Sequence, residues 1–216
     1  MFKSDIVNDI ETCGAMAIVR VENLERAFEI AEGCLCGGIN IMEISYTYNN
    51  AGKIIEGLSK NFKDQLQIGA GTVLDAETCR MAILAGAKFI IAPNYNHEVA
   101  IMCNRYQIPY APGCSTMTEA IQALEMGASY IKAFPISNFY GPKLGKVMMT
   151  PIPNLPLLAS GGANLDNIEE WLENGVSCIG FGSLLTRGSR QEIEMNAKKI
   201  RNKIDEYRQN KRRKYE

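Results

Sequence analysis

Four polar side chains fall in phase with apolar residues at the ends of predicted β-strands, where they could do chemistry together: Arg20, Glu43, Thr72 and Lys132. Apolar and aromatic residues flank Lys132 on both sides. Desolvation and a nearby cation such as Arg20 would favour its uncharged amine, which could then attack a carbonyl carbon. Glu43 would serve as the proton shuttle, directly or through one water.

An alternative is that Lys132 and Glu43 form an ion pair that merely fills the interior. A lone buried charge is costly, so a charged residue within an apolar strand is either paired or functional. Buried ion pairs stabilise weakly, and packing hardly accounts for a cluster of four polar residues. We therefore favour covalent chemistry at Lys132 over a structural ion pair.

A second group of residues has the composition of a phosphate site. Ser160-Gly161-Gly162 ends the seventh predicted strand, and Gly180-Phe181-Gly182-Ser183 ends the eighth. Loops at these two places form the recurrent phosphate site of β/α barrels, through backbone N–H groups and a helix N-terminus. Plain turn glycines are the alternative, which the paired occurrence makes less attractive.

The elements that must position these residues alternate along the chain. Short apolar runs predict eight strands: 15–20, 39–45, 67–72, 88–93, 109–112, 129–134, 156–160 and 177–182. Alternation of side chains predicts which residues face the interior: Met16, Ile18 and Arg20; Ile39, Ile41, Glu43 and Ser45; Ile68, Ala70 and Thr72; Tyr130, Lys132 and Phe134.

Helical patterns separate the strands, for example at 24–34, 76–84, 98–106, 119–125 and 165–173. Eight strand–helix units predict an α/β fold, a single (β/α)8 TIM barrel spanning residues 1–216. Residues 5–13 predict an extra N-terminal helix before the first strand. An open doubly wound sheet is the alternative, but the first strand is not followed by a glycine-rich phosphate turn.

Composition excludes several classes of function. The net charge of −1 gives no reason to expect a nucleic-acid or membrane partner. His97 is the one histidine and no ligand cluster appears, so we expect neither a metal nor another cofactor. Seven cysteines without a C-x-x-C pair indicate reduced thiols in a cytoplasmic protein. No signal peptide or membrane-spanning stretch is apparent.

Several segments together resemble the 2-keto-3-deoxy-6-phosphogluconate (KDPG) aldolase family, which includes 4-hydroxy-2-oxoglutarate (KHG) and 2-keto-3-deoxy-6-phosphogalactonate aldolases. They are Met42-Glu43-Ile44, Gly69-Ala70-Gly71-Thr72-Val73-Leu74, Ala92-Pro93-Asn94, Pro112-Gly113-Cys114-Ser115-Thr116, Lys132-Ala133-Phe134-Pro135 and Ser160-Gly161-Gly162. The resemblance runs from about residue 15 to residue 185. It implies a metal-free homotrimeric β/α barrel, a lyase that cleaves a phosphorylated 2-keto-3-deoxy sugar acid to pyruvate and glyceraldehyde 3-phosphate.

The resemblance also implies roles for particular residues. Lys132 would form the Schiff base and Glu43 would be the general acid and base. Substrate would contact Arg20, Thr72, Pro93 and Phe134, and the phosphate would bind Gly161, Gly162, Gly182 and Ser183.

One departure leaves the sugar epimer open. Gluconate-type members carry an arginine four residues after the glutamate, where this chain has Thr47. Arg20 and Pro93-Asn94 instead resemble the galactonate type, in which an arginine binds the pyruvate carboxylate. The segment from Phe134 to Pro142 is not a clean match to that branch. Activity on hydroxy-oxoglutarate is equally open.

Two other functions remain as alternatives. A phosphate-binding barrel isomerase or epimerase would share the fold and the phosphate loops, but would need no covalent lysine. A non-enzymatic barrel could instead bind a phosphorylated sugar acid as an effector. The combination of Lys132, Glu43 and Arg20 favours the aldolase over both.

Overall fold

Short apolar runs form a ring of parallel strands in the computed structural model, which describes residues 2–213; Met1 and residues 214–216 of the predicted domain lie outside them. The strands are β1 (Ala15–Val19), β2 (Ile41–Ser45), β3 (Gln67–Gly71), β4 (Ile90–Ile91), β5 (Tyr110–Ala111), β6 (Gly113–Cys114), β7 (Ile131–Ala133), β8 (Leu157–Ser160) and β9 (Val176–Phe181). All eight predicted strands are present, with ends that differ by no more than about two residues.

The ring closes through the fifth predicted strand, which Pro112 divides into β5 and β6. The sheet order is β5-β4-β3-β2-β1-β9-β8-β7-β6, so its two ends are consecutive in the chain. Proline has no N–H to donate to a ladder. However, its carbonyl accepts a hydrogen bond from Lys132 N at 2.9 Å, and Gly113 N donates to Ala92 O at 3.0 Å. This stretch thus pairs with both neighbours, and the fold is the predicted eight-stranded barrel rather than an open sheet.

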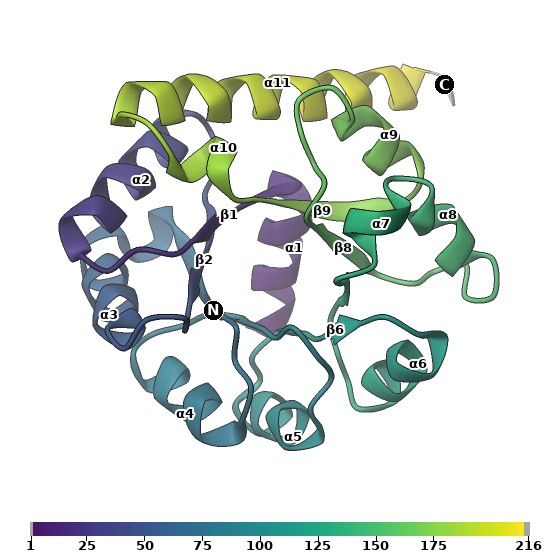
Figure 1. Ribbon diagram of the computed structural model, residues 1–216, viewed down its shortest axis with the longest axis horizontal. Helices are drawn as coiled ribbons and strands as arrows, with labels where there is room; N and C mark the ends of the chain where they lie inside the picture. The colour runs from purple at the N-terminus through teal and green to yellow at the C-terminus, as the bar shows by residue number, and fades with distance from the viewer. Residues whose placement is uncertain (1, 214–216) are drawn as a thin grey trace.

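The helices form an outer ring around the barrel, except α1, which is drawn within that ring (Figure 1). They are α1 (Lys3–Cys13), α2 (Leu24–Cys36), α3 (Ala51–Phe62), the 3-10 turn η1 (Lys63–Gln65), α4 (Ala76–Leu84), α5 (His97–Tyr106), α6 (Met117–Glu125), α7 (Ser137–Tyr140), α8 (Leu144–Met149), α9 (Ile168–Glu173), α10 (Ser183–Thr186) and α11 (Arg190–Arg213). Between residues 2 and 213, none of these helices is both long enough and apolar enough to cross a membrane.

The final helix α11 lies along the outside of α2 (Figure 1). Gly37, just past the end of α2, faces Ala197 on α11 so closely that a Cβ at Gly37 would overlap the Ala197 side chain. Ile193, Ala197, Ile200 and Ile204 form the buried face of α11. Small and branched apolar residues at this contact therefore hold α11 against α2.

Helix α1 closes the amino end of the barrel, as the extra N-terminal helix of the sequence prediction. Tyr130 donates a hydrogen bond from its hydroxyl to Val7 O at 3.0 Å, and Gln67 Nε2 donates to Asp9 Oδ2 at 2.7 Å. An apolar floor inside the barrel is lined by Ile10, Met16, Phe89, Tyr130 and Leu158, among others. A ligand must therefore reach the interior from the opposite end, where the strands finish.

Candidate active site

Glu43 and Lys132 face the barrel interior, above its apolar floor. Glu43 is 1% exposed and Lys132 is 5% exposed. Lys132 follows the floor residue Tyr130 by two positions, so alternation along the strand points both side chains inward. Glu43 is the register partner of Gly69, where a Cβ would point into the ring of Phe89, another floor residue. The predicted acid and amine thus share one enclosed space.

The carboxylate of Glu43 fills the place where a side chain at Gly71 would stand. A Cβ built on Gly71 would overlap Glu43 Oε1 and Cδ. Oε1 is buried and has no hydrogen-bond partner among residues 2–213. An unsatisfied buried oxygen is costly and uncommon, which makes this atom a candidate for contact with a ligand.

Lys132 is positioned by its backbone and by the residue two positions further on. Its N–H is held by Pro112 O, and its Nζ lies 4.9 Å from the ring centroid of Phe134. Ser115 Oγ in turn donates to Phe134 O at 3.1 Å. Within the described part of the chain, no ion pair joins Lys132 to Glu43, so the structural ion pair is not formed.

Thr72 reaches the site by a route that the sequence pattern does not predict. The prediction that Ile68, Ala70 and Thr72 share the interior face is wrong, because Gly69 and Gly71 occupy it. Thr72 instead has a left-handed backbone with φ of 59°, a rare conformation for a β-branched residue. Its Oγ1 lies 3.3 Å from the Oγ of Ser45, the buried residue that ends β2. This backbone strain brings Thr72 beside an interior residue of β2.

Pro93 lies against Gly113, the register partner of Lys132, and Cys114 is the next residue of that strand. Gly113 packs so closely on Pro93 that a Cβ there would overlap the Pro93 carbonyl. Cys114 pairs with Ala133 in the sheet. Burial, and to a smaller extent Glu119, raises the pKa of the Cys114 thiol to about 12. Cys114 therefore stays protonated at neutral pH and does not compete with the lysine as a nucleophile.

The predicted substrate-end residues lie at the rim. Arg20 follows β1 directly and is exposed, and it forms no ion pair with any residue in the range 2–213. Gly182 has no heavy atom within 4 Å of the place where its Cβ would stand, so its loop faces open space. Exposed Ser183 begins α10 immediately after it. These positions are accessible to a ligand that enters from the rim.

The loop after β8 is shaped by the segment that follows Lys132. Gly161 and Gly162 have φ of 101° and 75°, which favours glycine. Asn138 lies where a Cβ of Gly161 would stand. Ser137 Oγ, which is buried, donates to Ser160 O at 2.8 Å. The segment that follows Lys132 and the glycine loop that follows β8 are therefore in direct contact.

Known proteins share this arrangement of elements. Residues 6–201 match the family described as KDPG and KHG aldolase. The chain belongs to the KDPG and KHG aldolase family. A 2-dehydro-3-deoxy-6-phosphogalactonate aldolase of Escherichia coli is 31% identical over 90% of this chain and 94% of its own length. A 2-dehydro-3-deoxy-phosphogluconate aldolase of Treponema pallidum is 31% identical over 77% and 79%.

Solved structures place the chain in the same family of lyases. A structure described as native KDPGal superposes with a TM-score of 0.84, at 30% identity, covering 90% of this chain and 96% of the other. A KDPG aldolase from Legionella pneumophila, with pyruvate captured as a covalent carbinolamine, gives a TM-score of 0.78 at 29% identity, with 91% and 94% covered. Between residues 2 and 213, no group of three or more His, Cys, Asp or Glu side chains could hold a metal ion.

Three contributors to this aldolase site were missed in the sequence: Ser45 as a partner of Thr72, Gly71 as the seat of Glu43, and Asn138 over Gly161. A signal for the second was present. Two glycines spaced two apart in an apolar strand leave room on one face of the sheet, and a neighbouring side chain can occupy it. No comparable signal exists for Asn138, because its contact joins two loops through the fold.

We expect Gly71→Ala to disable the site without unfolding the barrel. The new methyl group would displace the Glu43 carboxylate, and a displacement of about 1 Å can lower a rate roughly a hundredfold. Steady-state pyruvate release, measured beside a thermal melt, tests this. Gly52→Ala in α3 is the matched control, because a Cβ there meets only the Tyr46 hydroxyl at 3.3 Å. Full activity in Gly71→Ala would show that turnover does not depend on the space that Gly71 leaves for the Glu43 carboxylate.

Proposed function

We propose that this protein is a class I aldolase that cleaves a 2-keto-3-deoxy-6-phospho sugar acid, of gluconate or galactonate type, to pyruvate and glyceraldehyde 3-phosphate. The observation that carries this proposal is the buried carboxylate oxygen of Glu43, which has no hydrogen-bond partner among residues 2–213 and lies in the chamber that also holds Lys132. The names of the relatives supply the substrate class, and the residue types supply the chemistry.

Lys132 starts the reaction by attacking the C2 carbonyl of the keto acid with its neutral amine. The carbinolamine loses water to give an iminium ion, which withdraws electrons from the C3–C4 bond. Glu43 removes the proton of the C4 hydroxyl, and the C3–C4 bond breaks to release glyceraldehyde 3-phosphate. The electron pair of that bond remains on C3 as an enamine attached to Lys132.

Glu43, now protonated, completes the cycle by returning a proton to C3. Water then adds to the iminium carbon, and pyruvate leaves as the amine of Lys132 is restored. The burial of Lys132, which is 5% exposed, favours this sequence because its amine is largely shielded from bulk water before each attack. The ring of Phe134, 4.9 Å from Nζ, limits the positions that the amine can take.

Rim residues hold the two ends of the substrate. We assign the carboxylate to Arg20, whose guanidinium can form a two-bond fork, and the pyruvate pocket to Thr72, Pro93 and Phe134. We assign the distal phosphate to the loops of Gly161, Gly162, Gly182 and Ser183. The open space beside Gly182 supports this assignment, since a side chain there would occupy the path of the ligand.

Borohydride together with pyruvate should attach one reduced pyruvate to Lys132, and the adduct should also form in Glu43→Gln. Turnover of Glu43→Gln should fall roughly 10²–10⁴-fold, because the C4 proton has lost its acceptor while the amine remains. Peptide mass spectrometry locates the adduct, and coupled pyruvate release measures turnover.

Lys146→Met on the exposed face of α8 is the matched control for lysine loss, and should trap and turn over normally. Turnover that survives in Lys132→Met would instead favour an isomerase or epimerase without covalent chemistry. Binding of the phosphorylated acids without turnover by the wild type would favour an effector-binding barrel.

A panel of substrates should distinguish the contribution of the phosphate end from that of the reacting carbonyl. We expect pyruvate release from at least one of the two phosphorylated epimers, and a much higher KM for the corresponding unphosphorylated acid. The glycine loops then lose their ligand while Lys132 keeps its carbonyl. Equal KM values for both forms would contradict the phosphate assignment and leave the lysine assignment standing.

We further propose that the aldolase works in the cytoplasm as a homotrimer. Seven free cysteines support a reducing compartment. Exposed Met81, Leu84 and Tyr106 on the adjoining helices α4 and α5 support a contact between copies. Leu84→Glu should convert trimers to monomers in sedimentation, whereas Met195→Glu on α11 should not. A monomeric wild type would contradict the trimer, and recovery of the protein in a secreted fraction would contradict the cytoplasmic location.

A further inference from the structure

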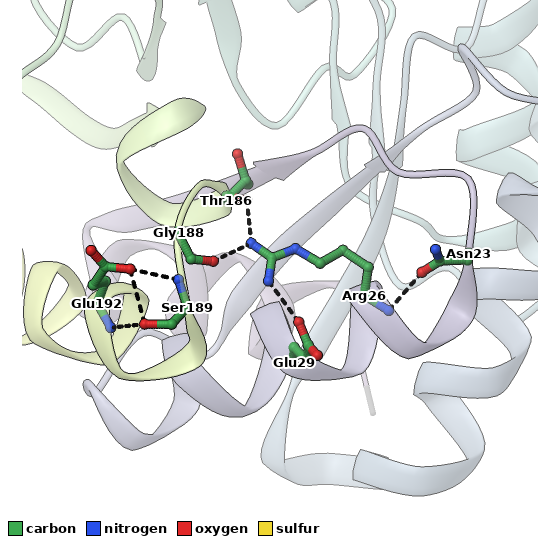
Figure 2. A network of polar contacts seen from close by, with 7 residues as sticks. All are labelled: Asn23, Arg26, Glu29, Thr186, Gly188, Ser189 and Glu192. Atoms are coloured by element: carbon green, nitrogen blue, oxygen red, sulfur yellow. Dashed lines mark hydrogen bonds and ion pairs between the residues drawn. The ribbon is translucent and has the colours of Figure 1, made fainter.

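Arg26, in the first turn of α2, joins two segments that lie far apart in the chain (Figure 2). Its Nη2 donates hydrogen bonds to Thr186 O at 2.9 Å and to Gly188 O at 2.7 Å. Its Nη1 lies 2.6 Å from Glu29 Oε2, which orients the guanidinium. The side chain is 26% exposed, so most of it is shielded from water. The cross-link is therefore a fixed three-bond contact rather than a loose surface pair.

On one side, this cross-link is anchored in α2, and the loop that carries Arg20 is fixed to the start of that helix. Asn23 accepts a hydrogen bond from Arg26 N at 2.8 Å and so caps α2. The side-chain amide of Asn50 donates to Glu22 O, which ties the same loop to the segment before α3. The chain between Arg20 and Arg26 is thus fixed at several points.

On the other side, the cross-link holds the loop of Gly182 and Ser183. Thr186 offers its carbonyl to Arg26, and its Oγ1 donates to Gly182 O at 3.0 Å. Two hydrogen bonds in series therefore connect the guanidinium to the proposed phosphate loop. Helix α10 is a single turn of four residues, which has little stability of its own.

The turn after α10 is also held from its far end. Ser189 and Glu192 form a reciprocal cap at the start of α11, with Ser189 N donating to Glu192 Oε2 at 2.7 Å and Glu192 N donating to Ser189 Oγ at 3.3 Å (Figure 2). Gly188 lies between this cap and Arg26. The position of α10 is consequently set by α11 on one side and by Arg26 on the other.

We infer that Arg26 is a positioning residue that fixes the distance between the carboxylate-binding and phosphate-binding ends of the substrate site. The inference rests on the proposed function. A keto acid with a carboxylate at one end and a phosphate at the other must present C2 to Lys132 while both ends are bound. The planar guanidinium holds two carbonyls and one carboxylate in a fixed fork, whereas the three donors of an ammonium rotate freely around one atom, so lysine is a poorer replacement.

The test compares Arg26→Met and Arg26→Lys with the wild type in two assays. Cleavage of the phosphorylated acid gives KM and kcat. Exchange of the pyruvate methyl protons in deuterium oxide reports on Lys132 chemistry without any phosphate. We expect KM for cleavage to rise roughly ten- to a hundredfold in Arg26→Met and less in Arg26→Lys, with pyruvate exchange unchanged.

Arg201→Met is the matched control, because the Arg201 guanidinium also bonds a carboxylate, Asp205 Oδ2 at 3.0 Å, and a backbone carbonyl, Thr12 O at 3.2 Å, but it joins α11 to the end of α1. A purely structural role for Arg26 would lower exchange and cleavage together through the folded fraction and leave KM unchanged, and that result overturns the inference. An unchanged KM in a fully active variant overturns it as well.

If Arg26→Met does not fold, Arg26→Lys carries the same comparison. A wild type that exchanges pyruvate protons but does not cleave phosphorylated acids overturns the proposed substrate, and this inference with it. If the wild type strongly prefers the phosphorylated acid and an Arg26 variant shows the same preference, the role of Arg26 is overturned and the proposed substrate stands.

Discussion

The site depends on one constraint: an acid and an amine are kept inside an apolar barrel without being allowed to neutralise each other. A carboxylate oxygen that is buried and unpaired, as in Glu43, costs free energy that a hydrogen bond would recover. An ion pair between Lys132 and Glu43 would engage both the proposed nucleophile and the oxygen that has no partner among residues 2–213. The fold must therefore keep the two groups in one chamber yet apart, and the rest of the structure follows from that need.

Separation comes from the strands rather than from the side chains themselves. Glu43 lies against β3, where Gly71 leaves room for the carboxylate, and Lys132 stands on β7, held by the carbonyl of Pro112. Below them α1 and the apolar floor exclude water from the amino end. In the proposed mechanism, substrate that enters from the rim supplies the partner that Glu43 lacks among residues 2–213, so that the interaction forms only when it can assist the reaction.

Much of this could be predicted from the sequence, because the signals were local. Eight apolar runs predicted the barrel, and the phase of Lys132 and Glu43 within their strands predicted that both face its interior. The phase of β3 was predicted wrongly, because apolar Ile68 and Ala70 look like core, whereas glycine gives no hydrophobic signal on the face that Glu43 fills. The division at Pro112 and the left-handed Thr72 depend on neighbouring strands, which a linear pattern does not contain.

Contacts such as that of Arg26 with Thr186 were equally invisible, since 160 residues separate the partners. Such contacts position the loops at the rim of the barrel. The proposed reacting pair, Lys132 and Glu43, depends on the packing of the barrel interior. The distance between Arg20 and the glycine loops depends instead on helix side chains such as Arg26, which can be replaced without changing that packing. Rim substitutions could then alter which acid fits while the chemistry at Lys132 is retained. The exposed Thr47 is a position of this kind: it lies outside the chamber, and Glu43 is in place without an arginine there.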